Sequence, residues 1–164
     1  MIVGILSDTH GRADTAAVAV RLLREQKAEY LIHCGDVCGE TVLDALAGVP
    51  SAFVYGNNDY DRVDLARYAH ALGIQCLGDG GTLDLGGKRI AVTHGDNSRT
   101  VTQLASKMTG AHYLLTGHTH QRHDRRVGSV RWINPGALYR ALVRSVAVLD
   151  VSTDTLTFLN VPDD

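Results

Sequence analysis

Short apolar runs alternate with longer amphipathic segments through the first half of the chain. Three runs are uninterrupted enough to predict buried strands, at residues 2–7, 30–33 and 51–55. Apolar residues recur at helical spacing after each run and predict helices at 13–27, 39–47 and 61–72. This order of strands and helices favours a parallel sheet with right-handed crossovers.

The second half of the chain has a different pattern, in which pairs of strand-like runs are joined by short turns. Three such pairs predict β-hairpins, at 82–92, 122–133 and 144–161. A helix at 98–109 and a strand at 111–115 are expected between the first two hairpins. A parallel half joined to hairpins predicts a single α/β domain over 1–164, with two packed mixed sheets covered by helices.

Polar residues that can bind metal follow directly after five of the apolar runs. They are Asp8, His10, Asp36, Asn57, His94, His118 and His120. In open α/β sheets, ligands bind in the crevice beyond the carboxyl ends of the strands. Five strand ends that all carry Asp, Asn or His therefore predict one shared polar site.

The donor atoms of this set indicate which ions it could bind. Thiolate ligands would indicate structural zinc, and oxygen-only ligands would indicate magnesium or calcium. The two carboxylates, one amide oxygen and four imidazoles of this set instead fit Mn, Fe, Co, Ni or Zn. Seven ligands are too many for one catalytic ion that keeps an open position, so two divalent ions sharing a bridging carboxylate are predicted. Two-metal sites, with ions about 3.5–4 Å apart, carry out in-line displacement at phosphorus. We expect manganese, with nickel, cobalt, iron and zinc as alternatives.

Composition adds limits on partners and location. The formal net charge of −2 gives no electrostatic reason to expect nucleic acid or an anionic membrane as a partner. Cys34, Cys38 and Cys76 are expected to be small buried side chains, with a redox or zinc role for Cys34 and Cys38 as the alternative. No apolar stretch approaches the ~18 residues of a membrane span, and no signal-peptide pattern is present, so a cytoplasmic location is expected.

The polar strand ends also form an ordered set of motifs with which the chain resembles a known family. It resembles the calcineurin-like metallophosphoesterases, and within them the small single-domain phosphodiesterases of bacteria and archaea. The motifs are Ser7–Gly11, Gly35–Val37, Gly56–Asp59, Thr93–Gly95, Gly117–His120 and Asn134–Gly136. The resemblance implies an αββα four-layer sandwich of two mixed sheets flanked by helices, in agreement with the pattern above.

The resemblance also implies how the two ions would be bound. One ion would be bound by Asp8, His10, Asp36 and His120, and the other by Asp36, Asn57, His94 and His118. Asp36 would bridge the ions, while Asn57 and His94 would also orient the substrate. A hydroxide shared by the ions would attack phosphorus opposite the leaving group.

Four further residues are expected around this ligand set. Asp59 would support the ligands from behind, and Asn134 would brace the ligand loops. His33 has either a supporting role of this kind or a purely structural one in the core. Arg12 is a candidate contact for the phosphate of the substrate.

One position departs from the pattern of many family members. Where they have His in Gly-Asn-His-Asp, this chain has Asn58, whose amide cannot act as a general acid near neutral pH. Protonation of the leaving group therefore has no assigned residue, whereas metal binding is unaffected.

The expected function is that of a metal-dependent phosphodiesterase acting on a small-molecule phosphate ester. A phosphomonoesterase or a nuclease could use the same site, although no basic groove or recognition domain is visible for a nuclease. An alternative function from a different class is that of a non-catalytic protein-interaction scaffold. The retromer coat contains a subunit of this fold that has such a role, and its metal site is degraded. This chain keeps every ligand position. Small relatives often form dimers or tetramers, but the sequence marks no interface.

Overall fold

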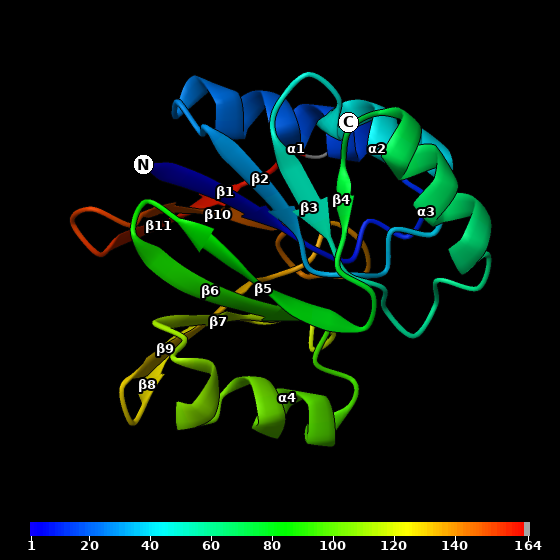
Figure 1. Ribbon diagram of the computed structural model, residues 1–164. Coiled ribbons are helices and arrows are strands. Elements are labelled where there is room, and N and C mark those ends of the chain that lie inside the picture. Colours follow the sequence, from blue (N-terminus) through cyan, green and yellow to red (C-terminus); the bar gives the residue numbers. More distant parts are fainter. Residues whose placement is uncertain (163–164) are drawn as a thin grey trace.

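A computed structural model, which describes residues 1–162, confirms the four-layer sandwich (Figure 1). Three helices cover the outer face of one sheet: α1 (Ala13–Glu25), α2 (Glu40–Leu46) and α3 (Arg62–Ala71). The second sheet lies against the other face of the first and is covered by α4 (Ser98–Leu104).

The first sheet has six strands, in the order β11-β10-β1-β2-β3-β4. Their bounds are β1 Ile2–Leu6, β2 Tyr30–His33, β3 Ser51–Phe53, β4 Gln75–Cys76, β10 Ser145–Asp150 and β11 Thr155–Asn160. Strands β1 to β4 are parallel, whereas β10 pairs antiparallel with β1 and with β11. The parallel strands place the loops after β1, β2 and β3 at one edge of the sheet.

The second sheet has five strands, in the order β5-β6-β7-β9-β8. Their bounds are β5 Gly80–Leu85, β6 Lys88–Thr93, β7 Tyr113–Leu115, β8 Arg122–Val127 and β9 Val130–Pro135. β7 is parallel to β6 and to β9. The turn between β5 and β6 uses Gly86 and Gly87 at φ 57° and 75°, the left-handed conformation that a two-residue hairpin of this type requires.

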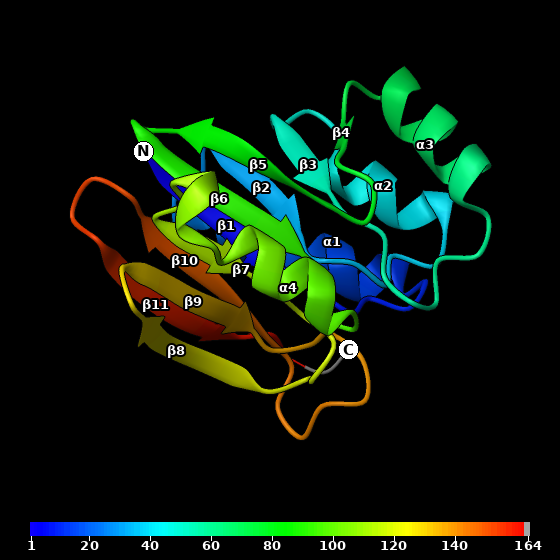
Figure 2. The same ribbon diagram turned by 60° about the horizontal axis from the view of Figure 1, so that its bottom comes forward.

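Three apolar clusters join the layers. The cluster between the sheets includes Val3, Ile5 and Ile32 from the first sheet and Ile90 and Leu115 from the second, all fully buried. A second cluster packs α1, α2 and α3 on the first sheet, and a third packs α4 on the second sheet, where Figure 2 shows that helix in front of the strands. Each sheet is therefore buried on both faces near its centre, which agrees with the uninterrupted apolar runs.

The structure corrects three details of the predicted elements. The helix expected at 98–109 ends at Leu104, and a short 3-10 helix follows at Lys107–Thr109. The strand expected at 51–55 ends at Phe53. The two-residue β4 was not predicted at all. Within residues 1–162 no helix is both long and apolar enough to cross a membrane.

Candidate metal centre

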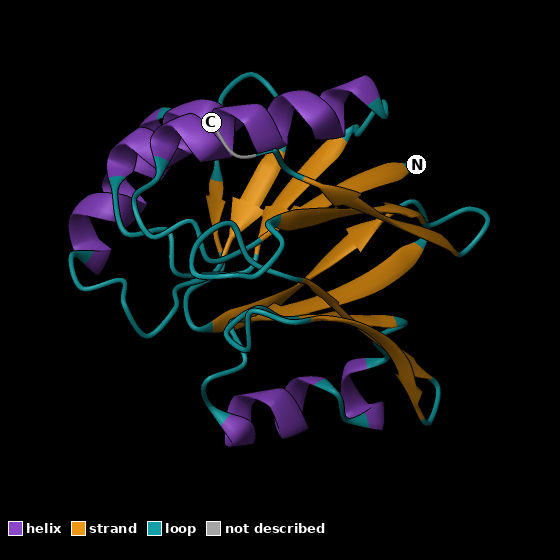
Figure 3. Ribbon diagram, turned by 180° about the vertical axis from the view of Figure 1, so that it is seen from behind, coloured by secondary structure: helices purple, strands orange, loops and turns teal. Residues whose placement is uncertain are grey.

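The loops after five strands meet on one side of the molecule, between the two sheets (Figure 3). The seven predicted ligands lie on these loops, after β1 (Asp8, His10), β2 (Asp36), β3 (Asn57), β6 (His94) and β7 (His118, His120). Because β1, β2 and β3 belong to one sheet and β6 and β7 to the other, both sheets contribute to the candidate site.

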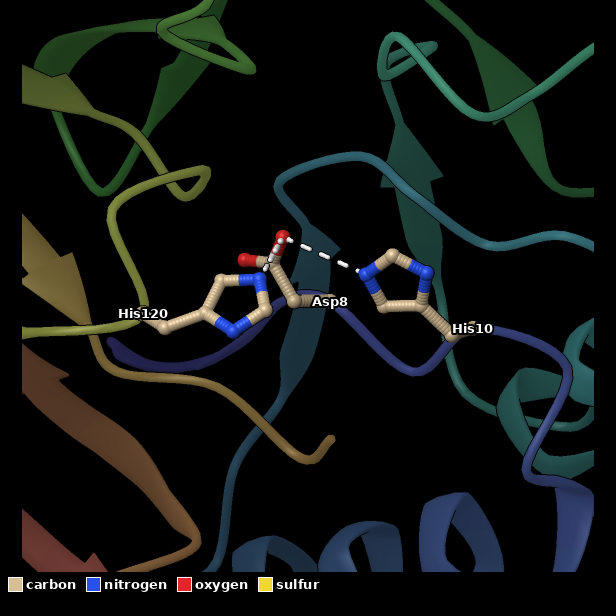
Figure 4. Close-up of side chains that lie close together, drawn as sticks. All are labelled: Asp8, His10 and His120. Atoms are coloured by element: carbon tan, nitrogen blue, oxygen red, sulfur yellow. Dashed lines mark ion pairs between the residues drawn. The ribbon is translucent and has the colours of Figure 1, made fainter. Parts of the chain in front are cut away.

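Asp8, His10 and His120 form a first cluster (Figure 4). Asp8 Oδ1 lies 3.2 Å from His120 Nε2 and 4.0 Å from His10 Nε2. The other oxygen, Oδ2, accepts hydrogen bonds from the Ser7 hydroxyl at 2.6 Å and from the His118 backbone N–H at 3.1 Å. These two bonds orient the carboxylate so that Oδ1 faces the imidazoles.

Asp36 and His94 form a second cluster with the same Asp8 carboxylate. Asp36 Oδ2 lies 3.4 Å from His10 Nε2 and 3.4 Å from His94 Nε2. His94 Nε2 lies 3.9 Å from Asp8 Oδ1. The two clusters thus share Asp8 and are joined by Asp36, so both carboxylates lie between His10 and His94.

Asn57 and His118 extend the second cluster. Asn57 Oδ1 lies 3.1 Å from His94 Nε2 and 3.0 Å from His118 Nδ1. His94 Nδ1 lies 2.8 Å from the Cys34 carbonyl oxygen, which can only accept, so Nδ1 carries the proton. When His94 is neutral, it directs a lone pair at Nε2 toward the oxygens of Asn57 and Asp36, so these acceptors then favour a positive charge among them, either a metal ion or a proton on Nε2.

Two buried polar atoms in the first cluster have no hydrogen-bond partner in the described part of the chain. They are Asp8 Oδ1 and His10 Nε2. An unpaired buried polar atom costs roughly 1–3 kcal/mol, and more when it is charged. A divalent ion would satisfy both atoms, and the mixed imidazole, carboxylate and amide donors suit first-row transition ions. The residues present therefore fit the predicted metal ions.

The charges of the two clusters depend on one another. Burial raises the pKa of the Asp8 carboxyl. Burial also acts to raise the pKa of Asp36, but hydrogen bonds from His94 and Asn58 outweigh it and lower that pKa below its usual range. Burial alone would lower the pKa of His94, yet the hydrogen bond to Asp36 and the charge of Asp8 raise it to about 9. In the absence of an ion, a proton on His94 thus neutralises part of the carboxylate charge.

We expect the affinity for Mn²⁺ to rise with pH, because an ion must displace this proton. The pKa of His94 is about 9 and only neutral imidazole binds metal, so below pH 9 each pH unit changes the apparent affinity by up to about ten-fold. Calorimetric titration at about pH 6 and pH 8, in buffers of different ionisation enthalpy, measures the affinity and the protons released. An affinity that does not change with pH would contradict a protonated His94.

Five of the seven predicted ligands have a left-handed backbone, with φ between 46° and 66°. They are Asp8, His10, Asp36, His118 and His120. Residues other than glycine rarely adopt this conformation, which costs on the order of 1–3 kcal/mol and persists where the surroundings fix it, often at functional sites. The chain therefore turns sharply after β1, β2 and β7, and these turns bring the ligand side chains together.

Asp59 joins two of the ligand loops. Its carboxylate accepts hydrogen bonds from the backbone N–H groups of Val37 at 3.3 Å, Cys38 at 2.7 Å and Gly56 at 2.8 Å. The first two donors follow Asp36, and the third precedes Asn57. Asp59 thereby connects the loop that carries Asp36 to the loop that carries Asn57, and its support of metal ligands stays a prediction.

Asn134 holds the loop of His118 and His120. Its side-chain Nδ2 donates to the Gly117 carbonyl at 2.6 Å and to the Thr119 hydroxyl at 3.1 Å, and its Oδ1 accepts from the Gly136 N–H at 2.9 Å. Asn134 is fully buried. These contacts connect the loop that carries His118 and His120 to the end of β9, and the bracing of metal ligands stays a prediction.

His33 connects the loops after β1 and β2. Its Nδ1 accepts from the Gly35 N–H at 3.2 Å, so its Nε2 carries the proton and donates to the Thr9 hydroxyl at 3.0 Å. That hydroxyl lies within hydrogen-bond distance of the Asp36 and Val37 carbonyls. Burial lowers the pKa of His33 to about 3, so the ring is neutral. Of the two roles left open by the sequence, these contacts favour support of the Asp36 loop.

Asn58, which stands where many relatives have His, binds the proposed bridging carboxylate. Its N–H donates to Asp36 Oδ1 and its side-chain Nδ2 donates to Asp36 Oδ2, both at 2.8 Å. Asn58 thereby orients Asp36, which is a role that the sequence did not suggest.

The cysteines take no part in the clusters. All three are free, and within residues 1–162 no candidate metal group includes a cysteine. Burial raises the pKa of the Cys38 thiol to about 12, so this side chain stays protonated near neutral pH although its Sγ lies 4.0 Å from His10 Nδ1. Cys34 is buried, as the sequence predicts, whereas Cys38 and Cys76 are only partly buried, which corrects the prediction for these two residues.

Arg12 lies beside the first cluster and is not part of it. Its Cζ atom stands 4.7 Å from the centre of the Tyr139 ring, and that ring centre is 5.0 Å from the centre of the His10 ring. Sequence reasoning missed Tyr139 and Arg140. They follow the last motif, and no spacing in the sequence links their loop to β1.

Two packed mixed sheets, with an Asp, Asn and His centre between their strand ends, are the features of a metal-dependent phosphoesterase. The chain belongs to the calcineurin-like phosphoesterase superfamily, whose domain matches residues 1–154.

Individual relatives agree with this assignment. The chain is 28% identical to phosphodiesterase MJ0936 of Methanocaldococcus jannaschii over 155 residues, covering 92% of this chain and 93% of that protein. A solved structure described as a novel archaeal phosphodiesterase superposes with a TM-score of 0.88 at 26% identity, covering 98% of this chain and 99% of the other. YfcE, a phosphoesterase from E. coli, has the same fold, with a TM-score of 0.70 at 20% identity over 99% of this chain and 100% of that one.

Proposed function

We propose that the chain is a phosphodiesterase that uses two divalent ions, one at each cluster. The observation that carries this proposal is the pair of clusters that share Asp8 and are joined by Asp36, with unpaired buried atoms at Asp8 and His10. Two ions need ligands that can face both of them, and Asp36 Oδ2 is equally distant from His10 and His94. Asp8 Oδ1 lies closer to His120, which makes Asp36 the better bridge.

The residues around the ions would have distinct roles. When bound, the ions would supply a water nucleophile at neutral pH and neutralise the phosphoryl oxygens. Asp8, His10 and His120 would bind one ion, and Asn57, His94 and His118 the other, with Asp36 between them. Asn57 and His94 would also orient the substrate. Mn²⁺ is the proposed ion, with Ni²⁺, Co²⁺, Fe²⁺ and Zn²⁺ as alternatives.

A cavity next to the centre argues against nucleic acid as the substrate. It has a volume of about 440 Å³, and its lining includes Asn58 together with Glu40, Asp61 and Asp64. Nucleic acid would bring further phosphates close to these carboxylates, whereas nucleic-acid sites neutralise phosphates with Lys and Arg. A small phosphate diester avoids this repulsion. The identity of MJ0936 as a phosphodiesterase favours a diester over a monoester.

The test is hydrolysis of bis(p-nitrophenyl) phosphate by protein stripped of metal and then given one ion at a time. We expect no turnover after chelation, and activity restored by Mn²⁺ or another first-row ion, with a higher kcat/KM for this diester than for p-nitrophenyl phosphate. Faster hydrolysis of the monoester would indicate a phosphomonoesterase, and cleavage of oligonucleotides a nuclease. Turnover with none of the five ions would favour the scaffold.

A further inference from the structure

The loop between β9 and β10 passes beside the first cluster and carries positive charge. The centre of the Tyr139 ring lies 5.0 Å from that of His10, and the Arg140 carbonyl oxygen lies 3.4 Å from His120 Nδ1. Arg12 reaches the same place from the loop after β1. The side chains of Arg12, Tyr139 and Arg140 are called the arginine site below.

Two guanidinium groups meet on one phenol ring at the arginine site. The Cζ atoms of Arg12 and Arg140 lie 4.7 Å and 5.1 Å from the ring centre of Tyr139, and hydrogen bonds from both groups lower the pKa of that phenol. Within residues 1–162, neither guanidinium has a carboxylate oxygen within 4.0 Å, whereas Arg131 pairs with Asp124 at 2.7 Å. Two cations held against the same ring repel each other. An anion between them would remove this repulsion.

The arginine site opens into a cavity of about 510 Å³. Arg12, Tyr139 and Arg140 line it together with Arg144 and with apolar side chains that include Leu142 and Val143. None of the seven proposed metal ligands lines this cavity. A group bound there would therefore lie beside the proposed metal centre, away from the phosphate that is hydrolysed.

The two cavities next to His10 have opposite charge. Cys38, whose Sγ lies 4.0 Å from His10 Nδ1, lines the cavity that contains Glu40, Asp61 and Asp64. An anionic group on a substrate would be repelled there and attracted to the arginine site. The charge distribution would thus select one orientation of an elongated substrate.

We propose that the arginine site binds a second phosphate group of the substrate, separate from the phosphodiester that is hydrolysed. The inference rests on the proposed phosphodiesterase function and narrows the substrate to phosphodiesters that carry a further phosphate. Two guanidiniums match the charge of a phosphate dianion and supply several donors in a planar geometry that phosphate oxygens accept. The apolar side chains of the cavity can contact the part of the substrate between the two phosphates.

Two substrates with the same leaving group test the proposal. One is the p-nitrophenyl ester of thymidine 5′-phosphate, and the other carries an additional phosphate on its 3′ oxygen. Release of p-nitrophenolate reports cleavage of the diester alone. We expect kcat/KM to be about ten-fold higher for the 3′-phosphorylated ester, which corresponds to one strong charge-assisted contact. Arg12→Gln and Arg140→Gln should each reduce this preference to less than about three-fold.

Arg21→Gln is the matched control, because Arg21 is an exposed arginine on α1 that lies outside both cavities next to His10. It makes the same charge change and should keep the preference. Equal kcat/KM for the two esters in the wild type would overturn the inference while the phosphodiesterase function stands. So would an equal loss on both esters in Arg140→Gln, because that result would place Arg140 on the scissile phosphate.

A binding measurement decides the inference even if the enzyme assay fails. Titration of the metal-free protein with inorganic phosphate should shift the arginine Nε–H signals of Arg12 and Arg140 in ¹H–¹⁵N spectra, and the shifts should saturate. The signal of Arg21 should not move. Equal shifts at Arg21 would overturn the inference. If neither ester is hydrolysed with any ion, the proposed function has failed, and this titration alone tests phosphate binding.

Discussion

Replacing Asp36 with asparagine is expected to lower kcat/KM for bis(p-nitrophenyl) phosphate by at least about 10³-fold with Mn²⁺ present, since the loss affects both proposed ions. Asp36 Oδ2 lies 3.4 Å from the Nε2 atoms of His10 and His94. The amide has nearly the same shape but no negative charge, and one of its two positions is a donor. It cannot bridge two cations as a carboxylate does. Initial rates with saturating Mn²⁺ measure the loss.

The metal content of the same variant separates a lost bridge from a lost fold. Asp36→Asn should bind fewer than two ions per chain by mass spectrometry while keeping the far-ultraviolet circular dichroism of the wild type. Asp14→Asn, an exposed position in the first turn of α1, makes the same chemical change outside the site and should leave activity and metal content unaltered. An Asp36→Asn protein with two ions and full activity would refute the bridge.

The placement of the ligands could be predicted because it depends on topology. The ends of parallel strands meet at one edge of a sheet, so a polar residue after β1, β2 or β3 must lie near the others. This rule alone predicts that Asp8 and Asp36 lie close together. The same argument holds for His94 and His118, because β6 and β7 are parallel in the second sheet.

The surroundings of the ligands could not be predicted, because they depend on loops without a repeating pattern. Tyr139 contacts His10 across more than a hundred residues of sequence, and no periodicity describes such a contact.

The helix expected at 98–109 ends early for a local reason that the sequence pattern does not indicate. The Thr109 hydroxyl lies 2.9 Å from the Leu104 carbonyl oxygen and 2.8 Å from that of Ser106, so its one hydrogen can be donated to an acceptor at or just after the end of α4.

Gly56→Ala is expected to destabilise the protein by about 1–3 kcal/mol, the usual cost of forcing extra atoms into a packed site. A methyl group on Gly56 would overlap the backbone nitrogen of Asp36 and lie 2.8 Å from its carboxyl carbon. A backbone atom cannot move aside as a flexible side chain does, so the loops after β2 and β3 would have to separate. Urea unfolding of the metal-free protein measures this change.

Metal binding should fail in the same variant, because the displaced segment carries Asp36 and is followed directly by Asn57. Wild-type protein should gain thermal stability as Mn²⁺ is added, by mass action on the folded state, and Gly56→Ala should gain little. Gly39→Ala is the control, since Gly39 is extended, at φ 163°, and the nearest atom to an added methyl lies 3.9 Å away. A Gly56→Ala protein as stable as Gly39→Ala, with the full Mn²⁺ effect, would mean that Asp36 is not confined by this loop. Its orientation would then depend on its other contacts, which include two hydrogen bonds from Asn58 and the neighbouring His94 ring.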